Sequence, residues 1–131
     1  MTAFIHTNVL VRHLTGEPPA QAAGATRYLG TADELLLPDL IVAEVAYVLE
    51  SFYEAPRPQV AETLRAIIAF PSIRVVDAEL LLRAVEVYDV HRLDFADAYL
   101  VASAERSGFG QIVSFDRGID RVGTVKRVEP E

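Results

Sequence analysis

The sequence contains no cysteine, which excludes disulfide bonds and thiolate metal sites. No apolar run free of charged residues approaches the roughly 20 residues that a membrane-spanning helix needs. The segment from Met1 to His6 has no basic region and no cleavage site, so we expect no secretory signal peptide. These absences are compatible with a cytoplasmic protein that makes no use of a membrane.

Basic residues are few as well. The chain has 12 Lys and Arg against 19 Asp and Glu, which gives a formal net charge of −7. Nucleic-acid-binding modules usually carry a basic surface, so this balance argues mildly against a tight RNA-binding or DNA-binding module. It does not exclude a nuclease, whose carboxylates are partly neutralised when a metal ion binds. It also indicates that a basic partner would associate readily.

The length of 131 residues fits one domain, 1–131, and the composition of 51% hydrophobic and 24% charged residues is that of a globular protein. We expect strands at 3–6, 34–37, 73–76, 111–115 and 124–128, and helices at 9–14, 19–29, 40–52, 59–69, 78–91 and 94–107. Strands that alternate with helices predict an α/β fold with a parallel sheet covered by helices on both faces.

Short polar residues mark the expected helix starts. Thr7 and Asn8 are predicted to cap the first helix, Asp39 the helix that starts at Leu40, and Asp94 the last helix. The last helix is predicted to end at Gly108, because glycine is favoured just past a helix C-terminus. No repeat, low-complexity tract or interdomain linker is present.

Three acidic residues, Glu44, Asp97 and Asp116, lie in otherwise apolar segments. A carboxylate loses hydration in such a place, and several carboxylates close together repel one another. A divalent cation resolves both problems, so the pattern favours a site for Mg²⁺ or a similar ion. Each residue also has a structural interpretation: Glu44 on a helix flank, Asp97 in a capping box with Asp94, and Asp116 in a turn.

The predicted sheet supports the metal interpretation. His6 ends the first strand and Asp116 follows the fourth, so both are expected at the carboxyl edge, where ligands bind in open parallel sheets. Asn8 is interpretable as a cap residue or as a group that orients a neighbouring carboxylate. We therefore predict that His6, Glu44, Asp97 and Asp116 converge at this edge.

The ordered set of segments resembles the PIN-domain family, and especially the VapC-type ribonuclease toxins of bacterial toxin–antitoxin pairs. The resemblance is carried by Phe4 to Leu10, by Glu44 in a mid-chain apolar helix, by Asp94-Phe95-Ala96-Asp97-Ala98 and by Ser114-Phe115-Asp116. It spans nearly the whole chain. It implies a three-layer α/β/α domain with a central, mainly parallel sheet of four or five strands.

The resemblance also implies an activity, which is Mg²⁺-dependent or Mn²⁺-dependent endoribonuclease cleavage of RNA phosphodiesters by an ion-bound water. The implied metal-binding and catalytic residues are Glu44, Asp97, Asp116 and His6, with supporting roles for Thr7, Asn8, Asp94 and Ser114. The implied partners are an RNA substrate, a cognate VapB-type antitoxin that blocks the site, and a second copy of the chain in a homodimer.

His6 departs from the family pattern, which has a metal-binding aspartate at this position. Imidazole binds Mn²⁺ or Zn²⁺ but is a poor ligand for Mg²⁺, and it removes one negative charge from the site. We therefore favour an inactivating substitution, deliberate or selected, over a natural histidine site. The alternative function is a catalytically inactive PIN-fold protein that acts as an antitoxin-binding interaction module. A receiver-like phosphoacceptor domain fits less well, because the sequence lacks its phosphoacceptor aspartate and late lysine.

Overall fold

A computed structural model of the chain describes all 131 residues. In chain order the elements are β1 (Thr2–Phe4), α1 (Thr7–Thr15), α2 (Pro19–Thr31), β2 (Glu34–Leu36), α3 (Asp39–Ser51), α4 (Arg57–Ile68), β3 (Ile73–Arg74), α5 (Ala78–His91), α6 (Phe95–Ser107), β4 (Gln111–Val113), the 3₁₀ helix η1 (Arg117–Arg121) and β5 (Lys126–Val128). Each predicted helix and strand is present, and η1 is the one element that was not predicted. None of the helices combines the length and apolarity that a membrane span requires.

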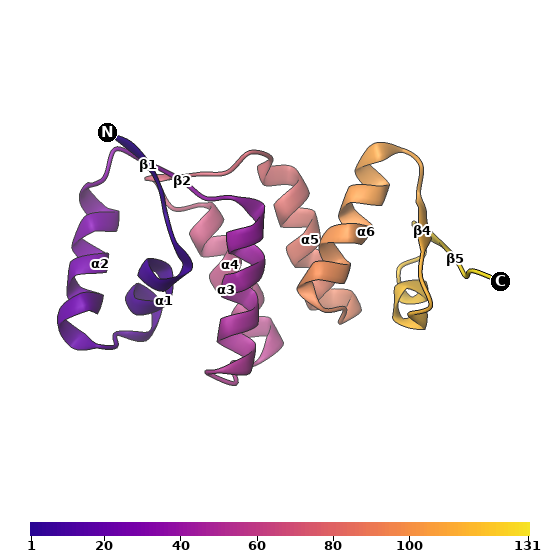
Figure 1. The fold of residues 1–131 in the computed structure, drawn as a ribbon, viewed down its shortest axis with the longest axis horizontal. Helices are drawn as coiled ribbons and strands as arrows, with labels where there is room; N and C mark the ends of the chain where they lie inside the picture. Colours follow the sequence, from indigo (N-terminus) through magenta and orange to yellow (C-terminus); the bar gives the residue numbers. More distant parts are fainter.

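All strand pairs are parallel, so the predicted α/β class is confirmed. The strands form two sheets, however: one with the order β1-β2-β3 and one of β4 with β5. The expectation of one central sheet of four or five strands is therefore wrong for this structure. Figure 1 shows β4 and β5 at the C-terminal end of the molecule beyond α6, whereas β1 and β2 lie near α1, α2 and α3. Strand β4 packs against α6 with Ile112 buried, and β1 keeps an unpaired edge.

Local signals set most helix ends. Pro19 begins α2, as expected for a residue whose fixed φ suits the first helical turn. Gly16 and Gly108 end α1 and α6 with φ of 75° and 81°, a left-handed conformation that glycine adopts without strain. Arg92 ends α5 with φ of 60°, a left-handed conformation that is uncommon for residues other than glycine.

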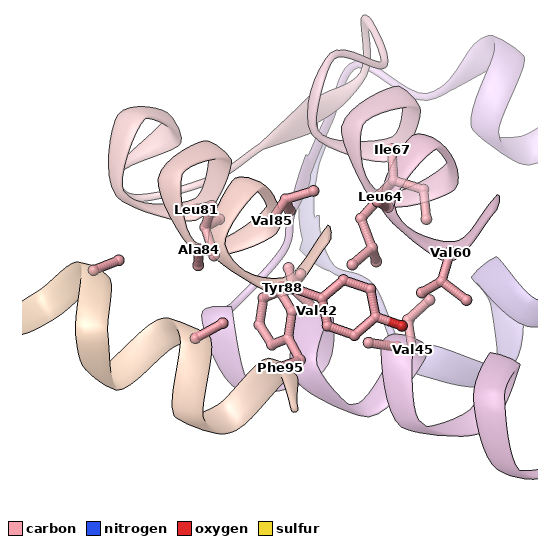
Figure 2. Close-up of a cluster of buried hydrophobic side chains, with 14 of the residues drawn as sticks. Val42, Val45, Val60, Leu64, Ile67, Leu81, Ala84, Val85, Tyr88 and Phe95 are labelled. Atoms are coloured by element: carbon pink, nitrogen blue, oxygen red, sulfur yellow. The ribbon is translucent and has the colours of Figure 1, made fainter. Parts of the chain in front are cut away.

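The core is a cluster of 27 buried residues that extends from Ile5 to Val122. Figure 2 shows its centre, where side chains from α3, α4 and α5 meet Phe95 at the start of α6. Tyr88 is fully buried, and its ring centroid lies 6.2 Å from that of Phe95. This packing fixes the N-terminal turn of α6, which carries Asp94 and Asp97.

Arg57 joins α4 to the same region. Its guanidinium stacks over the Tyr88 ring, 4.4 Å from the centroid, and Nη1 donates to the carbonyl oxygens of Tyr88 (2.8 Å) and Leu93 (2.7 Å). Tyr88 in turn donates its hydroxyl to Glu50 of α3, and desolvation by burial, followed by this hydrogen bond, raises the pKa of Tyr88. The chain entering α6 is therefore held by α3, α4 and α5 together.

Two adjacent leucines of α5 provide a test of this core. Leu81→Ala is expected to lower the free energy of unfolding by about 2–5 kcal/mol, because Leu81 is fully buried and its truncation leaves a cavity. Leu82→Ala is the matched control, since Leu82 is 41% exposed, and is expected to cost less than about 1 kcal/mol. Urea unfolding measures both, and equal losses would contradict the assignment of the buried face of α5.

Candidate active site

His6 forms the N-cap of α1. Its backbone is extended (φ −92°, ψ 153°), and its Nδ1 accepts a hydrogen bond of 3.0 Å from the Asn8 N–H. The predicted cap by Thr7 and Asn8 is therefore wrong, because the helix begins at Thr7 and the preceding residue supplies the acceptor. Aspartate and asparagine usually occupy such a position, and a neutral imidazole with an unprotonated Nδ1 takes their role here.

Replacement of His6 tests this capping role. His6→Ala removes the acceptor and is expected to lower the free energy of unfolding by about 0.5–2 kcal/mol. His6→Asn keeps a side-chain acceptor and is expected to be at least as stable as the unaltered chain. Thermal unfolding followed by circular dichroism measures both, and equal stability of the Ala and Asn variants would show that the Nδ1 contact contributes nothing.

His6 and Glu44 line the same hollow of about 680 Å³, which lies between α1, the turn at Glu17 to Pro19, and α3. Thr7 and Asn8 line it as well. The Thr7 hydroxyl is buried and has no hydrogen-bond partner, and buried polar groups without partners are rare enough to mark a site of interest. Glu44 itself is exposed, so the predicted conflict between its charge and an apolar burial does not arise.

Asp97 and Asp116 belong to a second acidic group with Asp94. Asp97 is half-buried in the first turn of α6, and burial, followed by repulsion from Asp116 and Asp94, raises the pKa of its carboxyl group. Of the three acids predicted to lie in apolar surroundings, Asp97 alone is partly buried, since Asp116 is exposed as well. Asp94 occupies the N-cap position of α6 as predicted, but its side chain makes no capping hydrogen bond.

Ser114 and the chain after it hold Asp116 in place. The Ser114 hydroxyl accepts a hydrogen bond of 2.9 Å from the Asp116 N–H, and Asp116 Oδ1 accepts one of 2.8 Å from the Gly118 N–H. Asp116 is therefore the N-cap of η1, which agrees with its interpretation as a turn residue. One carboxylate oxygen, Oδ2, takes part in neither of these hydrogen bonds.

The four predicted ligands do not converge on one point in this structure. No group of three or more His, Asp or Glu side chains is close enough to hold a metal ion. His6 and Glu44 share the hollow beside α1, while Asp97 and Asp116 interact at the start of α6. The division follows from the sheets, because β1 leads to His6 and β4 leads to Asp116, and these two strands are not paired.

Asp39 and Tyr99 form a link between α3 and α6 that the sequence did not reveal. Tyr99 donates its hydroxyl to Asp39 Oδ2, while Asp39 Oδ1 is buried without a partner. The hydrogen bond to Asp39 raises the pKa of Tyr99 to about 12. Asp39 was predicted to cap a helix from Leu40, but α3 begins at Asp39 itself and no side chain caps it. An aspartate after Pro38 is typical of a helix cap, and this local pattern gives no indication that Asp39 contacts α6.

Comparison with known proteins identifies the family. Residues 3–125 match the PIN domain, a range that includes His6, Glu44, Asp97 and Asp116. The chain belongs to the PIN domain family. Within this family it is similar to a protein named VapC ribonuclease from Aquifex aeolicus (strain VF5), with 26% identity over 98 residues, 75% of this chain and 72% of that protein. The resemblance noted in the sequence is therefore confirmed at the level of the PIN family.

Proposed function

We propose that this PIN-domain protein is a metal-dependent endoribonuclease toxin of the VapC type whose activity is weakened by His6. The observation that carries the proposal is the PIN match over residues 3–125, a range that contains all four candidate residues. The similarity to a VapC ribonuclease supports RNA as the substrate. The raised pKa of Asp97 adds a physical argument, since repelling carboxylates are what a divalent cation would stabilise.

The donor chemistry suits Mg²⁺ or Mn²⁺ at three of the four positions, because Glu44, Asp97 and Asp116 offer carboxylate oxygens. The arrangement does not fit one ion, since the residues lie in two separate pairs. A centre that contains all four would need these pairs to be closer than they are here. No hydrolytic step through an ion therefore follows from this geometry.

His6 is also poorly prepared to bind a cation. Its Nδ1 accepts the Asn8 N–H, so the neutral ring carries its proton on Nε2, and neither nitrogen presents a free lone pair. An aspartate at this position has two oxygens, of which one caps α1 and the other is free for a ligand. The capping contact thus gives a structural reason why aspartate can both cap α1 and bind a metal ion, whereas histidine only caps the helix.

The proposed partners follow from the same assignment. A VapB-type antitoxin with a basic segment would suit the net charge of −7, and a homodimer in the cytoplasm is the proposed setting. The alternative function, a catalytically inactive module that binds an antitoxin, is favoured by the division of the candidate ligands into two pairs. The two functions differ in whether RNA is cut.

The experiment that separates them is an RNase assay of the purified chain beside its His6→Asp variant, with Mg²⁺ or Mn²⁺. Growth of cells that express each form alone, with and without a co-expressed antitoxin, provides the corresponding test in vivo. Arrest by His6→Asp that the antitoxin relieves supports the toxin. A His6→Asp form that neither cuts RNA nor arrests growth, but still binds the antitoxin, supports the interaction module.

A further inference from the structure

Two hollows adjoin each other on α1. The first, of about 680 Å³, contains His6 and Glu44. The second, of about 540 Å³, lies between α1 and α2 and contains Gln21. Asn8 and Arg12, one helical turn apart on α1, line both hollows, so they form the wall between them. A ligand that extends from the first hollow into the second therefore passes Arg12.

The Arg12 guanidinium is held in place without a counter-charge. Its Nε donates to Gln21 Oε1 at 2.5 Å and its Nη1 donates to the Asn8 carbonyl at 3.2 Å, and both acceptors are neutral. Arg12 makes no ion pair with a carboxylate, in contrast to Arg83 or Arg127. An oriented arginine with a free charge is suited to bind a phosphate group.

Each hollow also has one tyrosine on its wall. Tyr53, 47% exposed, lines the first hollow, and Tyr28, 44% exposed, lines the second. An exposed aromatic ring can stack against a nucleic-acid base. Proteins that bind single-stranded nucleic acid combine cationic groups with aromatic rings on which the bases stack.

We propose that these two hollows form a binding track for single-stranded RNA that leads to the candidate active site. Arg12 holds a backbone phosphate, and Tyr53 and Tyr28 each stack against a base on either side of it. Arg12 is a substrate-binding residue in this assignment. Glu17 and Glu44 line the first hollow and repel phosphate, which confines the phosphate to the Arg12 wall. The inference rests on the proposed ribonuclease function and names how its substrate is held.

Binding without cleavage tests the track. Fluorescence anisotropy of a labelled single-stranded RNA, with EDTA present to remove divalent ions, gives the dissociation constant of the full chain at several salt concentrations. Arg12→Gln is expected to weaken binding about tenfold or more and to reduce the slope of log K against log salt by about 0.7, the value for one phosphate contact on a single strand. Arg12→Lys is expected to restore the slope, because it keeps the charge.

The tyrosine variants and a control complete the experiment. Tyr28→Leu and Tyr53→Leu are each expected to weaken binding about five- to hundredfold without changing the salt slope, because a stacking contact is lost and no charge. Lys126→Gln is the matched control, since Lys126 is exposed on β5, lies outside both hollows and makes no ion pair. It is expected to leave affinity within about twofold and the unfolding midpoint unchanged.

Several outcomes would contradict the proposed RNA-binding track. Equal affinity and slope for Arg12→Gln and Lys126→Gln would do so, and so would an absence of measurable RNA binding by the unaltered chain. Arg12-dependent binding of an acidic peptide, with RNA binding unaffected, would assign the hollows to a protein partner instead.

The failure of the track is distinguishable from the failure of the proposed function. If only the track is wrong, the His6→Asp form cleaves RNA, and adding Arg12→Gln to it leaves its KM for RNA unaltered. If only the proposed ribonuclease function is wrong, the His6→Asp form does not cleave RNA, while RNA binding still depends on Arg12.

Discussion

The His6→Asp variant is expected to cleave single-stranded RNA in the presence of Mg²⁺ or Mn²⁺ about a hundredfold or more faster than the chain with His6. Loss of one charged ligand at a phosphoryl-transfer site typically removes several kcal/mol of transition-state stabilisation, and each 1.4 kcal/mol corresponds to a factor of ten in rate. A single added carboxylate is thus expected to have a large effect on the rate of RNA cleavage. The measurement is the initial rate of cleavage of a labelled RNA by each purified protein.

His6→Asn is the control that separates the effect of the added negative charge from the effect of the N-cap hydrogen bond. Asparagine accepts the Asn8 N–H as aspartate does, so it preserves the start of α1, but it brings no anionic oxygen. We expect the Asn variant to be as inactive as the chain with His6. Robust cleavage by the histidine form would make His6 a working ligand, and an inert Asp form with every RNA and metal tried would favour the interaction module.

Asp97→Asn is expected to have opposite effects on activity and on stability. In the His6→Asp background it is expected to abolish cleavage, because a proposed ligand is lost. In the metal-free chain it is expected to raise the free energy of unfolding, since burial and the charges of Asp116 and Asp94 disfavour the ionised carboxylate. Opposite signs of this kind are typical of a functional residue rather than of a structural one.

The dependence on pH follows from the raised pKa of Asp97. The ionised carboxylate destabilises the fold above the folded-state pKa, so the gain from Asp97→Asn is fully present at neutral pH. As the pH falls through the raised folded-state pKa and then below the ordinary value of 3.8, the carboxyl group becomes protonated in both states and the gain disappears. Urea unfolding at a series of pH values measures this difference between the two proteins.

Asp89→Asn is the control for the loss of a charge, because Asp89 of α5 does not contribute to the raised pKa of Asp97 and makes one contact of 3.4 Å with Arg65. It is expected to change stability by less than about 0.5 kcal/mol. If Asp97→Asn instead lowers the free energy of unfolding by more than about 1 kcal/mol, the role of Asp97 in the first turn of α6 outweighs the repulsion.

The helices and strands were predictable because their signals are local. Pro19 and Gly108 act through their own backbone preferences, and the apolar periodicity of α5 is visible within 14 residues. The division of the strands into two sheets was not predictable, because it depends on where β4 lies relative to α6 and β1. No residue near β4 in the sequence indicates which strand it pairs with.

The sequence predicts which residues are candidates for the site, but not the contacts that they make. The order of His6, Glu44, Asp97 and Asp116 along the chain is a property of the sequence, and all four lie within the residues that match the PIN domain. The cap formed by His6 was missed because histidine is an unusual N-cap residue. The contact between Asp39 and Tyr99 joins residues 60 positions apart, and no local pattern reveals such a pair.

Position 6 is central to the proposed function, because we expect it to be a metal-ligand position that histidine fills poorly. Calorimetric titration of Mg²⁺ and Mn²⁺ into the purified His6, His6→Asp and His6→Asn proteins tests this directly. We predict the tightest Mg²⁺ binding in the Asp form and much weaker binding in the other two, with a smaller deficit of the His6 form for Mn²⁺, because imidazole accepts Mn²⁺ better than Mg²⁺. Equal Mg²⁺ affinity in the His6 and Asp proteins would show that position 6 is not a ligand and would contradict the account.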